Sequence, residues 1–218
     1  MSTVQKRQPL SRERVLDAAI ALADRDGLDA LSMRKLAQAL GVEAMSLYNH
    51  VANKGDLVDA MVDRVIAEIE LPDGDWEDAV RRCAISAHAT FVRHPWACEP
   101  AMSPSRLPSE PNARMHYMEW LLGQLRRAGF SPELAYRGYH ALDSHILGFT
   151  LWELGHSMPG VADLDDVAEI IRGILSTGKF PNLLEHLEQH LDPPQGKSEF
   201  EYGLDLILEG LKRARNPS

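Results

Sequence analysis

The sequence has few cysteines and no long hydrophobic run. Cys83 and Cys98 are the two cysteines among 218 residues, and no His/Cys spacing typical of a zinc module accompanies them. We therefore expect buried thiols, with no disulfide, metal site or cofactor. No apolar stretch has the length of a signal-peptide core or a membrane span, so we expect a cytoplasmic protein with no membrane partner.

The sequence also lacks the strict alternation of apolar and polar residues that predicts β-strands. Hydrophobic residues recur instead at helical spacing, which predicts the all-α fold class. At 44% hydrophobic content the chain can bury a core as one domain or two small ones. The helices that we expect span 11–26, 33–40, 44–50, 54–70, 75–94, 95–102, 113–128, 131–155, 163–175, 181–191 and 198–214.

Charge is distributed unevenly along the chain. The net charge is −9, yet the residues up to Gly55 include eight basic and six acidic side chains. The acidic surplus therefore lies entirely beyond Gly55. A mildly basic head on an acidic body is typical of a polyanion-binding module joined to a part that stays off polyanions.

Two short segments of helical pattern meet at a corner, Gly41-Val42. The first, 33–40, follows Ser32 as a capping residue, and Gly41 ends it where a left-handed backbone is easiest. The second, 44–50, can bury only Leu47, so its other residues face outward. Two helices joined by a short glycine-containing turn are the geometry that places the second helix in the DNA major groove. The alternative is a three-helix unit whose exposed polar residues are only solvated surface.

A groove-reading helix needs short or flat outward residues that form hydrogen bonds or meet a thymine methyl. Ala44, Met45 and Ser46 fall in its first turn, where base edges come closest. Phosphates are the expected partners of Tyr48, His50 and Lys54, and of Arg34 on the preceding helix, which could also reach a guanine.

The segment "LSMRKLAQALGVEAMSLYNHVANKGDLVDAM" closely resembles the N-terminal DNA-binding domain of the tetracycline-repressor family. "FEYGLDLILEGL", residues 200–211, resembles the final dimerisation helix of the same family. The resemblance implies a homodimeric transcriptional regulator, usually a repressor, that a small molecule releases from a palindromic double-stranded DNA operator. Position by position, it assigns DNA contacts with retained chemistry to Arg34, Ser46, Tyr48, His50 and Lys54, and contacts with altered chemistry to Ala44, Met45 and Asn49.

The resemblance also implies a domain organisation: 1–55 as the helix-turn-helix domain, 56–70 as a linking helix, and 71–218 for effector binding and dimerisation. Gly203 and Gly210, seven residues apart in a helix, indicate a closely packed neighbour, since glycine inside a helix costs about 0.5–1 kcal/mol. By resemblance the neighbour is the partner subunit, and the alternative is packing within one chain. The expected dimerisation residues are Phe200, Gly203, Leu204, Ile207, Gly210 and Leu211.

The effector is not expected to be tetracycline. The tetracycline repressors bind the drug through magnesium with a histidine in the segment that reads "WACEPAMSP" here, and this segment has none. Cys83 and Ala87 replace the family's Asn and Phe. An apolar cleft with a few polar groups is typical of small-molecule sites in helical bundles. The candidates for such a cleft, each of which could equally be core, are His88, Phe91, Met102, His116, Tyr117, Trp120, His140, Asp143 and Trp152.

Two other functions remain open. "HALDSH" could indicate a metal or acid/base site, but on a helix His140 and Asp143 share a face while His145 points away from them. The first alternative is therefore a helical enzyme that uses His140 and Asp143, with turnover and no specific DNA affinity. The second is a DNA-binding regulator with no small-molecule effector. For the main hypothesis we expect no catalytic residue.

Overall fold

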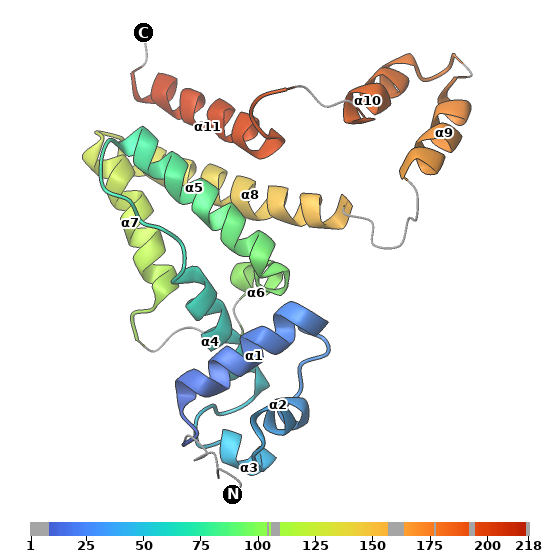
Figure 1. The fold of residues 1–218 in the computed structure, drawn as a ribbon. Helices are drawn as coiled ribbons and strands as arrows, with labels where there is room; N and C mark the ends of the chain where they lie inside the picture. Colours follow the sequence, from blue (N-terminus) through green and yellow to red (C-terminus); the bar gives the residue numbers. More distant parts are fainter. Residues whose placement is uncertain are drawn as a thin grey trace, which may run out of the picture.

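Helices make up the regular structure of the chain. The computed structural model describes residues 9–103, 105, 110–156, 164–176, 178–191 and 195–216. Lys6 and Arg7 of the basic head, and residue 163 at the start of an expected helix, lie outside these ranges. Within them no strand occurs, so the expected all-α class is confirmed (Figure 1).

Three helices form a small cluster beside the N-terminus: α1 (Arg12–Asp26), α2 (Met33–Leu40) and α3 (Ala44–Leu47) (Figure 1). The serine caps predicted for the first two are confirmed. Ser11 Oγ accepts a hydrogen bond from the Arg14 amide, and Ser32 Oγ accepts one from Lys35. Such caps satisfy amides that the helix leaves without partners. We call this cluster and the start of the next helix, residues 9–55, the head.

Helix α4 (Lys54–Ile66) is shared between two hydrophobic cores. Asn53 Oδ1 accepts from the Asp56 amide and Asp56 Oδ2 accepts from the Ala52 amide, both at 2.9 Å, which fixes the start of the helix. Leu57 and Met61 belong to the core of the head, whereas Val65 and Ile66 belong to the core of the rest of the chain. The helix ends before the expected residue 70, because the chain turns through 67–69.

The rest of the chain, which we call the body, is a helical bundle. Helix α8 (Pro132–His156) packs against α5 (Trp76–Arg93), α7 (Ala113–Arg127) and α11 (Glu199–Arg215). The expected helix 95–102 is a 3-10 turn, η1 (Pro95–Ala97), followed by α6 (Cys98–Met102). Helices α9 (Leu164–Leu175) and α10 (Pro181–Leu191) pair with each other and lie apart from the bundle (Figure 1).

Both cysteines are free and buried, as expected. Burial raises the pKa of Cys83 to about 12 and that of Cys98 to about 11, so both thiols are neutral and inert near neutral pH. Among the helices of the described ranges, none is long and apolar enough to cross a membrane.

Candidate functional site

The corner between α2 and α3 depends on glycine. Gly41 has φ 66° and ψ 37°, in the left-handed region, and the following Val42 amide donates to Ala37 O at 3.0 Å. Helix α3 is shorter than the expected 44–50, because residues 48–50 continue as a turn. Leu47 and Val51, fully and almost fully buried, fix α3 on the head. The corner therefore presents a short helix that buries one face.

The candidate DNA-contacting residues lie on the exposed part of this corner. Met45 is 75% exposed and Tyr48 is 46% exposed, although both are large and apolar or aromatic. The polar members make no side-chain hydrogen bond or ion pair with any described residue. Arg34, Asn49 and Lys54 are also exposed, and Ala44, Ser46 and His50 are partly exposed. Unpaired donors on one rigid surface are what a phosphate backbone and base edges require.

Asp24 of α1 joins the head to the body. Its Oδ1 accepts a hydrogen bond from Trp96 Nε1 at 2.7 Å, and His94 Nδ1 lies 2.7 Å from the same oxygen. On its other side the His94 ring lies 3.5 Å from Glu68, which also binds Arg93. The His94 side chain is only 12% exposed, so these contacts are better shielded from solvent than an ordinary surface pair.

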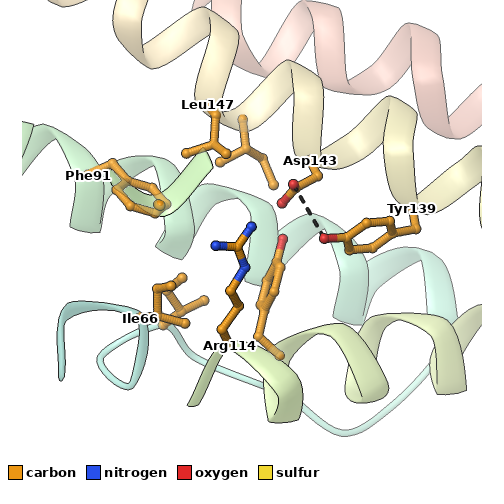
Figure 2. A pocket seen from close by; sticks show the side chains of 10 residues that line it. Ile66, Phe91, Arg114, Tyr139, Asp143 and Leu147 are labelled. Atoms are coloured by element: carbon orange, nitrogen blue, oxygen red, sulfur yellow. Dashed lines mark hydrogen bonds between the residues drawn. The ribbon is translucent and has the colours of Figure 1, made fainter. Parts of the chain in front are cut away.

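A small cavity lies in the body where α4, α5, α7 and α8 meet. Its apolar wall is made by Ile66, Ile69, Phe91, Ala101, Ile146 and Leu147, and its polar wall by Arg114, Tyr117, Tyr139 and Asp143. Figure 2 shows the Arg114 side chain rising from α7 toward Asp143, with Ile66 and Phe91 to one side. The cavity has a volume of about 20 Å³, enough for about one water molecule.

Burial disfavours the ionised forms of the three acidic groups on the polar wall. Burial raises the pKa of Asp143, and nearby Arg114, a hydrogen bond from Tyr139 and His140 oppose that rise. Tyr139 Oη donates to Asp143 Oδ2 at 3.4 Å, a long bond, and burial raises the pKa of Tyr139 to about 12. Burial likewise raises the pKa of Tyr117 well above its ordinary value. The phenols are therefore hydrogen-bond donors at neutral pH.

The structure brings together three of the nine residues expected at an effector site. Phe91, Tyr117 and Asp143 line the cavity, whereas Met102 and His116 are exposed outside it. Trp120 is partly buried, and its indole N–H has no partner among the described residues. Sequence reasoning missed Arg114 and Tyr139. Their helical spacing to Tyr117 and Asp143, i to i+3 and i to i+4, was the available signal.

His88 and Trp152 line a second, open groove of about 850 Å³ between α5, α8, α10 and α11. The His88 ring stacks on Phe200 at 4.1 Å and its Nδ1 lies 2.7 Å from Thr150 Oγ1. Burial lowers the pKa of His88, although Glu153 opposes the shift. Contacts within the chain thus hold His88, as expected if it is a core residue and not a ligand contact.

The "HALDSH" residues do not converge. His140 is exposed and packs edge-on against Tyr136 and Tyr139, while Asp143 lines the cavity. His145 Nε2 lies 2.9 Å from Phe200 O, in the groove on the other side of α8. The described residues contain no group of three or more acidic, His or Cys side chains arranged to hold a metal ion.

Helix α11 directs most of its expected dimerisation residues into its own protomer. Phe200, Leu204 and Leu211 are buried in the body core, and Ile207 packs against that core. A side chain at Gly203 would collide with His145, so this glycine allows close packing within the chain. Gly210 faces open space. The exposed apolar residues of α11 are Tyr202 and Leu206, each 61% exposed, and the sequence analysis did not select them.

Two family models match the chain. Residues 15–61 match bacterial regulatory proteins of the tetR family, and residues 70–215 match the tetracyclin repressor-like, C-terminal domain. HTH-type transcriptional repressor DrrR1 of Streptomyces coeruleorubidus is 33% identical over 215 residues, which cover 93% of this chain and 77% of that protein. Tetracycline repressor protein class D of Escherichia coli is 30% identical over 209 residues, covering 93% and 89%.

Solved structures are similar over nearly the whole chain. Apo ActR from Streptomyces coelicolor has a TM-score of 0.77 at 33% identity, covering 96% of this chain and 98% of that one. ActR in complex with actinorhodin has a TM-score of 0.75 at 33% identity, covering 96% and 100%. The latter is a relative with a small molecule bound.

Proposed function

The chain belongs to the tetracycline-repressor family of transcriptional regulators, and from that premise we propose that it is a homodimeric repressor released from a palindromic operator by a small molecule. We also propose a cytoplasmic location, because such a regulator binds chromosomal DNA. The observation that carries the proposal is α4, which contributes to the core of the head at one end and lines the body cavity at the other.

The head is the proposed DNA reader. Helix α3 would enter the major groove, with Ala44, Met45 and Ser46 nearest the base edges. Tyr48 and Lys54, exposed and unpaired within the described chain, would contact phosphates. In a dimer two such helices would read half-sites about 34–36 Å apart, or a multiple of that.

The second copy would pack on α8 and α11. Tyr202, Leu206 and Gly210 follow one another at i, i+4 spacing along one face of α11, with the two apolar side chains exposed. Gly148 of α8 has nothing within 4 Å of where a side chain would begin, so the backbone is accessible there. Exposed apolar side chains beside bare backbone suit a closely packed helical interface. The domain limits 1–55, 56–70 and 71–218 remain part of this proposal.

Effector binding would act on the head through α4. The Arg114 amide donates to Asp63 Oδ1 of α4 at 3.3 Å, and Ile66 and Ile69 line the cavity directly. A ligand larger than one water must displace these residues, and α4 would transmit the change to Leu57 and Met61 in the head. Typical coupling of this kind is about 1–3 kcal/mol. Tetracycline is not proposed as the ligand, because the family's magnesium-binding histidine is missing.

The test is a selection of sheared genomic DNA on the purified protein at a stated, near-physiological salt concentration, followed by sequencing of the retained fragments. We expect a palindrome whose half-sites are about one helical turn apart. Retention of random fragments only, by protein freed of co-purified ligands, would contradict the proposal and favour a helical enzyme or another role for the body.

A further inference from the structure

The cavity has one cation and too few acceptors for its donors. Among the described residues that line it, Arg114 is the only cation and Asp143 the only carboxylate. The guanidinium offers five N–H donors, and no described residue accepts a hydrogen bond from any of them. Tyr117 and Tyr139 add two hydroxyl donors. Asp143, already bonded to Tyr139, is the one strong side-chain acceptor on this wall.

This imbalance defines what a ligand must supply. Water is the other partner open to these donors, since Arg114 is half-buried, and an anion that replaces water in a partly enclosed site forms stronger, charge-assisted hydrogen bonds with the guanidinium. A planar guanidinium prefers two oxygens of a carboxylate or a similar anion, because two parallel N–H bonds fit its fork. The opposite wall, with Ile66, Phe91 and Leu147, offers only apolar contact (Figure 2).

We propose that the effector is a lipophilic organic acid, whose anionic oxygens bind Arg114 and whose apolar part packs against Ile66, Phe91 and Leu147. This inference rests on the proposed function, because it names the class of molecule that the regulatory cavity binds. A cationic ligand fits the site worse, since it would face the Arg114 guanidinium. Among the described lining residues the counter-charge would be Asp143, and its burial disfavours the ionised form.

Binding of an acid at Arg114 also explains how the cavity would signal. Arg114 is in the first turn of α7, and its own amide is bonded to Asp63 of α4. A ligand that draws the guanidinium into the cavity therefore pulls on α4 through one residue. A neutral ligand held by the apolar wall would reach α4 through Ile66 but would lack this second connection.

The test compares two probes of nearly equal shape, 2-naphthoate and 2-naphthamide, by isothermal titration against the full-length protein at neutral pH. We expect 2-naphthoate to bind at least about tenfold more tightly, the difference typical of one charge-assisted pair over a neutral hydrogen bond. Arg114→Gln should abolish the difference. Arg114→Lys keeps the positive charge but not the two parallel N–H groups, so it should retain part of the difference in affinity.

Arg127→Gln is the matched control. Arg127 is exposed on the same helix, thirteen residues and about 20 Å along it from Arg114, and its loss changes the net charge by the same amount. It should leave both affinities unchanged. Asp143→Asn, which removes the carboxylate beside the bound anion, should tighten 2-naphthoate and leave 2-naphthamide nearly unaffected.

Three results would overturn the inference: equal affinity for the two probes, an unchanged preference in folded Arg114→Gln, or binding of neither probe to the wild type. If Arg114→Gln does not fold, as judged by its melting temperature, the probe preference in the wild type and its reduction in Arg114→Lys decide the matter. Each of these failures leaves the proposed function intact, because operator selection is measured without a ligand. If the selection recovers no operator although 2-naphthoate is preferred, the cavity binds organic acids but the proposed function fails.

Discussion

The head and the body cavity present their polar side chains in opposite ways. Tyr48 and Lys54 are exposed at the head, whereas Tyr117 is 7% exposed and lines a small cavity with Arg114 and Asp143. Exposed groups on a rigid corner suit a large polyanion, and enclosed groups suit a small molecule. The proposed control of one region by the other requires an element common to both, and α4 contributes to both cores.

Removing one buried leucine from each region should have the largest effect and should destabilise that region more than the other. Leu47 is the fully buried anchor of α3, so Leu47→Ala should destabilise the head by about 2–5 kcal/mol and abolish operator binding. Leu121→Ala removes the same atoms from the body core. Hydrogen exchange should show faster opening of α1–α3 in the first variant and of α5, α7 and α8 in the second. Identical exchange patterns in the two variants would mean that head and body unfold as one unit and are not separate regions.

A glycine in each region should respond with opposite sign. Gly41→Ala places a side chain on a left-handed backbone and should cost about 1–2 kcal/mol, although the new methyl would meet nothing within 4 Å. Gly173→Ala, in the exposed helix α9 and equally free of neighbours, should stabilise that helix by up to about 1 kcal/mol. Urea unfolding measures both. A neutral Gly41→Ala would show that the corner tolerates another conformation.

Operator binding should depend on charges of the head and not on those of the body. Lys54→Ala should weaken binding by roughly tenfold and lower the salt dependence by about one unit of log–log slope per subunit. Tyr48→Ala should also weaken binding. Lys197→Ala, which removes an exposed body lysine, should change neither quantity. Fluorescence anisotropy over a salt series gives the slopes, and sedimentation gives the oligomeric state. Loss of the dimer in either head variant would mean that the DNA-binding surface has been assigned to the wrong part of the chain.

The smallest effect concerns the pH dependence of the body. Because burial raises the pKa of Asp143 in the folded state, its contribution to stability is full below the unfolded value of about 4 and is lost as pH rises through the folded pKa. The Asp143→Asn variant has no carboxyl group to ionise at this position. Its melting temperature should therefore rise relative to that of the wild type as the pH is raised to neutral. Asp78→Asn, at an exposed carboxylate, should show no such gain. The reverse trend for Asp143→Asn would contradict the burial argument.

The sequence predicted the helices and their caps well, because these depend on local residues such as Ser11, Ser32 and Gly41. It predicted the cavity only in part. Tyr139 and Asp143 lie one turn apart on α8, but Arg114 comes from α7, and the periodicity of one helix does not report which residues of another pack against it. The expected dimerisation residues include the apolar stripe through Phe200, Leu204 and Leu211, but helical periodicity does not reveal whether the protomer or a partner covers such a stripe.

The most direct test of the account is the affinity for the selected operator at one stated salt concentration, measured with and without an organic extract of cells that carry the gene. We expect an acidic fraction of the extract to weaken operator binding by about 5- to 150-fold, the usual range for coupled sites. An affinity that no fraction changes would contradict a cavity coupled to the head through α4.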